Sequence, residues 1–121
     1  MLLTFSAKIK GVIKLIILKG QRAKPYMDIY YIFLEGKPLP NNRESEELAG
    51  AFINCWINSK DEASAKDKAI KYVYNQGWEV LRIKEIFITN CERYGDEPES
   101  LNCYNQAIKY GIGAIFYTWP K

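Results

Sequence analysis

The stretch SKDEASAKDKAIKYVYNQG (residues 59–77), followed at once by WEVLRIKEIFIT (residues 78–89), decides the fold of this chain. Ser59 and Glu62 have the spacing of a capping box, in which the serine hydroxyl and the glutamate carboxylate accept hydrogen bonds from the free amides at a helix start. This spacing predicts a helix that begins at Lys60. The sequence therefore predicts a helix joined directly to a strand, and the rest of the fold is built around this unit.

The predicted helix has one apolar face and a defined end. Its apolar side chains recur at helical spacing: Ala65, Ala69, Ile70 and Val73. Gly77 is placed to end the helix, because glycine adopts the left-handed conformation of a helix terminus without steric cost. Residues 78–89 are rich in strand formers, and their apolar face shifts near Lys84 and Glu85. This shift predicts a bulge or a bend, within one long strand or between two short ones.

Two more strands are predicted before the helix. Residues 28–34 (DIYYIFL) are β-branched and aromatic, and Gly36 with the prolines that follow it is expected to end this strand. The polar, acidic residues 41–47 predict an exposed loop. Residues 51–58 (AFINCWIN) alternate as a half-buried strand does. The alternation places Ile53, Cys55 and Ile57 on one face, and Phe52, Asn54, Trp56 and Asn58 on the other.

A second helix and a last strand are predicted near the end of the chain. Asp96-Glu-Pro-Glu99 supplies a cap residue, an early-turn proline and a glutamate in the first turn. Apolar residues then recur at helical spacing as far as Gly111, where the helix is expected to stop. Residues 112–119 (IGAIFYTW) predict the final strand. The order from Met27 is therefore strand, strand, helix, strand, helix, strand.

This order predicts a single α+β domain over residues 27–121. We expect two helices packed on one face of a mixed or antiparallel sheet, in a ferredoxin-like or related arrangement. The ferredoxin-like order would require residues 78–89 to be split and the first strand to be an addition. With 48% hydrophobic residues, the chain has enough apolar content to bury a core without a disulfide or a metal.

Residues 1–26 form a basic, apolar leader that contains no acidic residue. Its six basic residues are Lys8, Lys10, Lys14, Lys19, Arg22 and Lys24. The whole chain has a formal net charge of +3, so residues 27–121 carry a net charge of −3. Any attraction of the chain for nucleic acid or an anionic membrane therefore depends on the leader.

The structure of the leader has several interpretations. A helical stripe of apolar residues runs through it: Ile9, Val12, Ile13, Ile16 and Ile17. With the lysines around it, this stripe is typical of an interfacial amphipathic helix. The β-branched side chains also suit a strand packed on the domain. The remaining alternatives are a tail and a natural protein chain that starts at Met27. The apolar residues 11–18 are interrupted by Lys14 and too few to span a bilayer, so we expect no transmembrane helix. The lysines that bracket and interrupt this stretch fit a secretory signal badly, so we expect a cytoplasmic protein.

The residue types of the common catalytic and metal sites are largely missing. The chain has no histidine, which is the usual general base near neutral pH. Its three cysteines lie at wide spacings, which predicts free thiols in a reducing compartment rather than disulfides or a zinc site. Cys91 is the best candidate for a reactive thiol, because it lies near Arg93 and a nearby cation favours the thiolate.

Two acidic clusters occur in the chain. They are Glu44, Glu46 and Glu47, and Asp96, Glu97 and Glu99. Carboxylate oxygens can hold Mg²⁺ or Ca²⁺, but neither cluster has the spacing of a calcium loop, and the second lies where a helix start favours negative charge. A structural or solvating role is the preferred interpretation, and no metal or cofactor is predicted.

The sequence favours a binding protein over an enzyme. The chain contains 3 Trp, 9 Tyr and 5 Phe, and aromatic residues are enriched at the centres of protein interfaces. We expect a small non-enzymatic domain that binds a protein partner or itself, for example as an inhibitor or immunity-type protein, with Trp56 and Trp119 as the partner-binding residues. The first alternative is binding of nucleic acid or an anionic membrane through the six basic residues of the leader. The second is a small enzyme that uses Cys91 or a carboxylate cluster.

Overall fold

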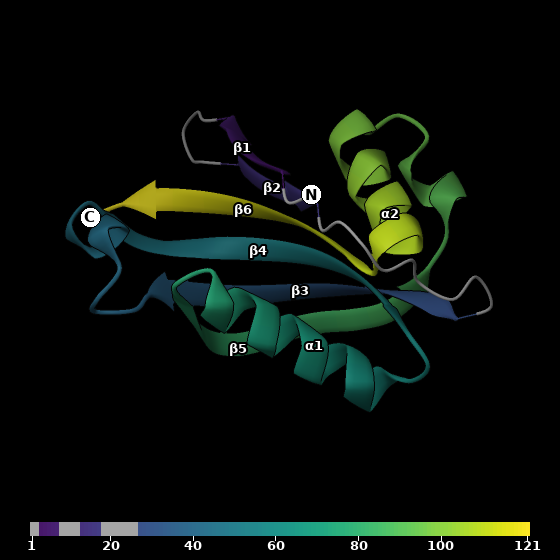
Figure 1. Cartoon of the computed structure of the whole chain (residues 1–121), viewed down its shortest axis with the longest axis horizontal. Coiled ribbons are helices and arrows are strands. Elements are labelled where there is room, and N and C mark those ends of the chain that lie inside the picture. The colour runs from purple at the N-terminus through teal and green to yellow at the C-terminus, as the bar shows by residue number, and fades with distance from the viewer. Residues whose placement is uncertain (1–2, 8–12, 18–26) are drawn as a thin grey trace.

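The computed structural model describes residues 3–7, 13–17 and 27–121, and describes side chains from residue 27 onward (Figure 1). Its elements are β1 (Leu3–Ala7), β2 (Ile13–Ile17), β3 (Asp28–Pro38), the 3-10 helix η1 (Arg43–Glu46), β4 (Leu48–Ser59), α1 (Glu62–Asn75), β5 (Trp78–Thr89), the 3-10 helix η2 (Cys91–Tyr94), α2 (Pro98–Tyr110) and β6 (Ile112–Pro120).

Strands β3 to β6 form one antiparallel sheet in the order β5-β3-β4-β6 (Figure 1). Helix α1 connects β4 to β5 across β3, and α2 connects the two edge strands β5 and β6. The structure confirms the α+β class, the predicted order of strands and helices after Met27, and the antiparallel sheet. The described residues contain no helix with the length and apolar character needed to cross a membrane.

In the leader, β1 pairs antiparallel with β2, and β2 lies beside β6. The amphipathic helix considered for this segment is therefore wrong for residues 13–17, which form a strand as their β-branched composition favours. Ile9 and Val12, which the helical interpretation also used, lie outside the described residues.

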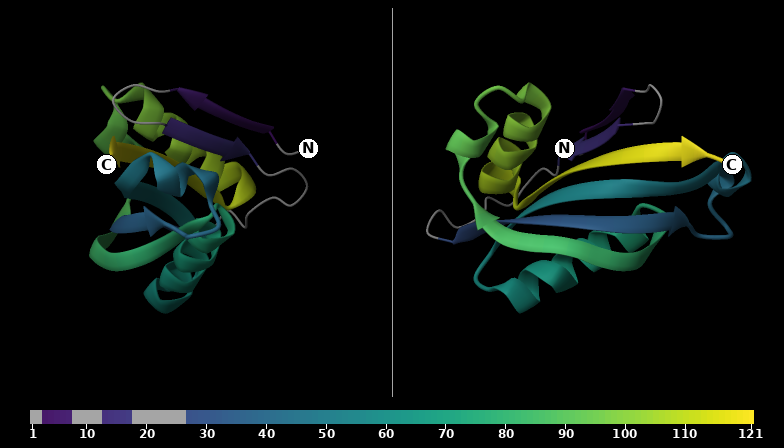
Figure 2. Two further views of the ribbon diagram at one scale, coloured as in Figure 1. Left: turned by 90° about the vertical axis from the view of Figure 1, so that its left-hand side faces the viewer. Right: turned by 180° about the vertical axis from the view of Figure 1, so that it is seen from behind.

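The two helices pack on opposite faces of the sheet, each over its own core (Figure 2). Helix α1 covers the face that carries Ile32, Cys55 and Phe116, whereas α2 covers the face that carries Trp56 and Ile115. The prediction that both helices share one face is wrong, and the ferredoxin-like arrangement built on it is not confirmed. The physical reason is that Trp56 and its neighbours give the second face enough apolar surface to bury a helix of its own.

Helix α1 begins at Glu62, two residues after the predicted start at Lys60. Its N-cap is Asp61, whose Oδ1 accepts a 2.8 Å hydrogen bond from the Ser64 amide. Ser59, the predicted cap, ends β4 instead, and its hydroxyl donates to the Asp61 carbonyl oxygen at 3.2 Å. The structure therefore confirms the helix and corrects its capping residue.

The apolar face of α1 is narrower than the sequence indicates. Ala65, Ala69 and Val73 have no exposed surface, as predicted. Ile70 is predicted on the same face but is 41% exposed, because it lies at the edge of the arc that the other three define. Gly77 follows the helix with a φ of +90°, in agreement with the prediction.

Strand β3 continues through Gly36 to Pro38, beyond the end predicted for it. Gly36 pairs with β4 on one side and β5 on the other. A Cβ atom at this position would lie 2.9 Å from the carbonyl oxygen of Glu79, so glycine permits a close approach of β5 here rather than ending the strand.

Strand β5 is one long strand with irregular pairing to β3. Phe33 pairs with Glu85 and Leu34 with Ile83, so Lys84 has no partner in the ladder. This confirms the bulge predicted near Lys84 and Glu85. The pairing shifts a second time between Glu35 and Gly36.

Helix α2 begins with Pro98 at its first position, after Glu97 as N-cap rather than the predicted Asp96. Gly111 ends the helix with a φ of +104°, which confirms the predicted stop. Cys103, Tyr104 and Ala107 of α2 complete the second core.

Candidate functional site

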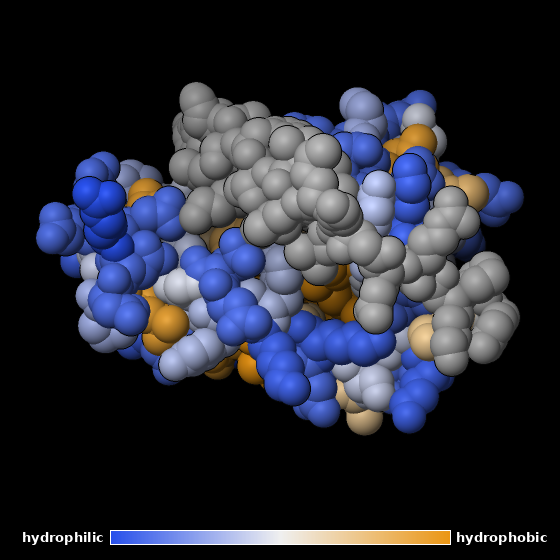
Figure 3. All heavy atoms as spheres, viewed as in Figure 1, coloured by the Kyte–Doolittle hydropathy of each residue, from blue (hydrophilic) through white to orange (hydrophobic). Residues whose placement is uncertain are grey.

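Hydrophilic side chains cover most of the described surface on the side of α1 (Figure 3). The candidate site lies on the other face of the sheet, where α2 covers only one end. There the neighbouring strands β3, β4 and β6 carry four aromatic side chains that α2 leaves partly exposed. We call this set the aromatic face: Phe33, Phe52, Tyr117 and Trp119.

The members of the aromatic face contact one another across the strands. The ring centroids of Phe52 lie 5.4 Å from Phe33 and 4.9 Å from Trp119, and Phe52 is paired in the ladder with Tyr117. Phe52 is 37% exposed and Tyr117 is 39% exposed. The Trp119 ring lies directly over Gly50, where a Cβ atom would clash with it. The result is a continuous aromatic strip that contacts solvent.

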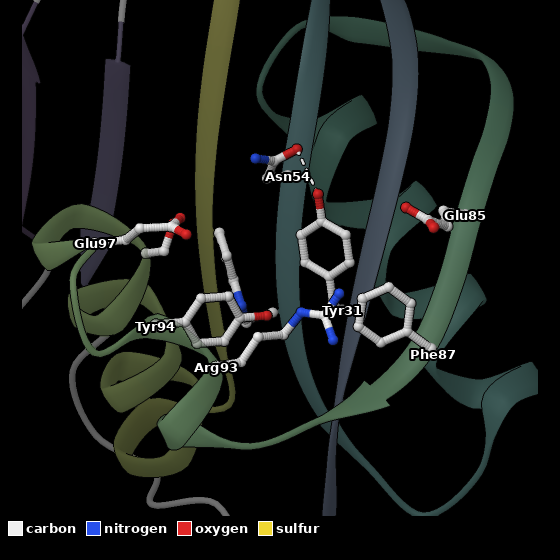
Figure 4. A pocket seen from close by; sticks show the side chains of 9 residues that line it. Tyr31, Asn54, Glu85, Phe87, Arg93, Tyr94 and Glu97 are labelled. Carbon is white, nitrogen blue, oxygen red and sulfur yellow. Dashed lines mark hydrogen bonds between the residues drawn. The ribbon is translucent and has the colours of Figure 1, made fainter.

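A hollow of about 200 Å³ lies between the aromatic face and the start of α2 (Figure 4). Its aromatic wall is formed by side chains from β3, β4, β5 and η2: Tyr31, Trp56, Phe87 and Tyr94. Three ionised side chains stand around it, and Figure 4 shows Glu97 and Glu85 on opposite sides with Arg93 between them. The hollow therefore combines a wall of tilted aromatic rings with charges of both signs.

Tyr31 is the centre of the aromatic wall. Its ring centroid lies 5.4 Å from that of Trp56 and 5.0 Å from that of Phe87. Its hydroxyl donates a 3.1 Å hydrogen bond to Asn54 Oδ1. Burial, followed by the nearby Tyr94 and Glu85, raises the pKa of Tyr31 to about 12, so the hydroxyl stays protonated near neutral pH.

The charges around the hollow have no ionic partner among the described residues. The Arg93 guanidinium carbon lies 4.5 Å from the centroid of the Phe87 ring, and neither Glu85 nor Glu97 approaches it as an ion pair. Glu97 accepts a 3.2 Å hydrogen bond from the Ser100 hydroxyl. Other acidic residues of β3 and β5 do form ion pairs: Glu79 with Lys37, and Glu35 with Arg82.

The structure separates the two tryptophans predicted to bind a partner. Trp56 has no exposed surface, although it lies on the opposite face of β4 from Ile53 and Ile57. It lies between the sheet and α2, with its ring centroid 5.7 Å from that of Tyr94. Trp119 is partly exposed on β6, an edge strand of the four-stranded sheet, and belongs to the aromatic face.

Of the other residues singled out in the sequence, Glu97 of the second acidic cluster lines the hollow, whereas the cysteines do not. Lys14 lies in β2, where the structure describes the backbone, and the other five basic residues of the leader lie outside the described residues. Cys91 is exposed in η2, while Cys55 and Cys103 are buried free thiols. Among the described residues, no three metal-ligating side chains come together.

The three thiols are expected to differ in reactivity. Burial raises the pKa of both Cys55 and Cys103, the latter to about 12. We expect Ellman's reagent to modify one thiol per native chain, that of Cys91, and all three after unfolding in guanidinium chloride. Cys91→Ser should abolish the native reaction, and rapid modification of more than one thiol before unfolding would contradict the burial of the other two.

The sequence points to aromatic residues in general but not to this set. The alternation of residues 51–58 places Phe52 on the same face of the strand as Trp56, and this is the one indication in the sequence that Phe52 belongs to the site. Tyr31, Phe87 and Tyr94 come from three separate elements, so no spacing in the sequence connects them.

Comparison of the chain with family models, with curated proteins and with solved structures finds no match.

Proposed function

We propose that this chain is a protein-binding domain whose contact surface consists of the aromatic face and the adjacent hollow. The observation that carries the proposal is the contact of Phe33, Phe52 and Trp119 in one partly exposed strip. Large aromatic side chains lose little conformational entropy on binding and supply most of the energy at the centres of protein interfaces. A strip of this kind supports protein binding better than any other arrangement among the described residues.

The charge of the domain favours a partner with a basic contact surface. Residues 27–121 carry a net charge of −3. Glu92 in η2, Asp96 in the following connection and Glu99 in α2 are exposed near the hollow. Opposite charge accelerates association and selects among partners more than it adds affinity. An inhibitor or immunity-type role is one function that would use such a surface. The same negative charge would repel nucleic acid, so binding of nucleic acid is proposed only for the basic leader.

The aromatic face is expected to retain the partner in affinity capture from a lysate of the native host. Phe52→Ser should weaken binding of the partner about thirtyfold, because truncation of a central aromatic anchor costs about 2 kcal/mol or more. Ile88→Ser is the matched control, since Ile88 is an apolar residue of β5 with 56% exposure and pairs with Tyr30 on the face that α1 covers.

Sedimentation velocity on the same proteins identifies the partner class. A dimer that Phe52→Ser dissociates would assign the aromatic face to self-association. A monomer that captures another protein in a Phe52-dependent manner would assign it to a different partner. Equal retention by the wild type and by both variants would contradict the proposed surface.

A further inference from the structure

The hollow beside the aromatic face has an excess of negative charge. Glu85 and Glu97 stand on opposite sides of it, and Arg93 is the third ionised group (Figure 4). Within the described ranges, none of the three forms an ion pair. Two carboxylates and one guanidinium leave a net charge of −1, which attracts a cation and disfavours an anion.

The aromatic wall favours a cation as well. The faces of aromatic rings are negative, so ammonium and guanidinium groups lie well against them. Arg93 demonstrates this preference at the site itself, because its guanidinium carbon lies 4.5 Å from the Phe87 ring centroid. The rings of Tyr31 and Tyr94 also line the hollow, and neither is in contact with a cation among the described residues.

We propose that the hollow receives a lysine or arginine side chain of the bound protein, with its cation attracted by the carboxylates of Glu85 and Glu97 and its apolar stem against Tyr31. A hollow of about 200 Å³ has room for one such side chain. The stem of a lysine or arginine packs on apolar surface while its charged end stays near water. The inference rests on the proposed function, because the side chain belongs to the protein that covers the aromatic face.

The test is an NMR titration of the full chain with a blocked arginine residue, N-acetyl-L-arginine N-methylamide, at low salt. We expect the indole N–H signal of Trp56 to shift and to saturate in the millimolar range, because Trp56 lines the hollow. The signal of Trp78, which is buried in the core under α1, should not move. The blocked glutamate residue, which has the opposite charge, is expected to cause no saturable shift.

Three variants test the role of charge. The double variant Glu85→Gln, Glu97→Gln should weaken binding of the blocked arginine about fivefold, since each partly exposed ion pair contributes a modest free energy. Arg93→Gln should strengthen it about twofold, because it removes a repulsive charge. Glu79→Gln is the matched control, an exposed carboxylate of the same strand outside the hollow, and should bind as the wild type does.

Two results would overturn the inference: a saturable shift with blocked glutamate, or wild-type affinity in the double variant. The proposed function is tested separately. If Phe52→Ser loses the captured partner but blocked arginine causes no shift, the inference fails and the protein-binding surface stands. If blocked arginine binds in a charge-dependent manner but capture does not depend on Phe52, the hollow binds a cation and the proposed protein-binding surface fails.

Discussion

Replacement of Gly113 by alanine is expected to destabilise the domain by about 3 kcal/mol. A Cβ atom at this position in β6 would collide with the carbonyl oxygen of Cys103 in α2. Because the obstacle is backbone rather than a side-chain end, α2 would have to move away from the sheet and expose the second core. Urea unfolding monitored by circular dichroism measures the loss.

Gly95→Ala is the matched control for this substitution. Gly95 has a φ of −54°, and the nearest atom to an added Cβ atom would be the Glu92 carbonyl oxygen at 3.8 Å. We expect a change within about 0.5 kcal/mol of the wild type. Equal stability of Gly113→Ala and Gly95→Ala would contradict the close packing of α2 on β6.

Truncation of Trp56 is expected to cost about 3–5 kcal/mol, which is enough to unfold a domain of ordinary stability. Trp56 has no exposed surface and packs against both Tyr31 and Tyr94. Trp56→Phe should cost less and leave a folded protein whose stability can be measured. Equilibrium unfolding of both variants provides the comparison.

Trp119→Ala is the counterpart on the surface. Trp119 is partly exposed and contacts Phe52 at the edge of the sheet. We expect it to lower the free energy of unfolding much less than Trp56→Ala does. Equal losses for the two alanine variants would show that Trp119 contributes no less to the packing of the domain than Trp56 does.

Features set by local chemistry were predictable from the sequence. Gly77 and Gly111 end the two helices with positive φ, because left-handed backbone after a helix is a property of glycine itself. The shift of the apolar face near Lys84 likewise predicts the bulge in β5. Each of these depends on residues that are neighbours in the chain.

Features set by distant packing were not predictable in the same way. The alternation in β4 correctly divides Ile53, Cys55 and Ile57 from Trp56, but it does not state whether the second face meets solvent or another helix. Burial of Trp56 follows from the position of α2, which the spacing of residues within α2 does not determine. The sequence also does not show that Gly36 permits the close approach of β5, because this approach exists only in the assembled sheet.

The hollow could not be predicted from the sequence. Arg93 and Glu97 follow one another closely in the chain, but Tyr31 and Glu85 reach the site from β3 and β5. The sheet order β5-β3-β4-β6 brings these residues together, and that order depends on long-range pairing rather than on local pattern.

Photo-crosslinking in native cells shows whether the aromatic face is a protein contact surface. The photoreactive amino acid p-benzoylphenylalanine would replace Phe52 in one protein and Ile88 in the other, two exposed apolar positions on opposite faces of the sheet. We expect a discrete adduct of higher mass from position 52 and none from position 88. An adduct formed equally at both positions, or at position 88 alone, would contradict it.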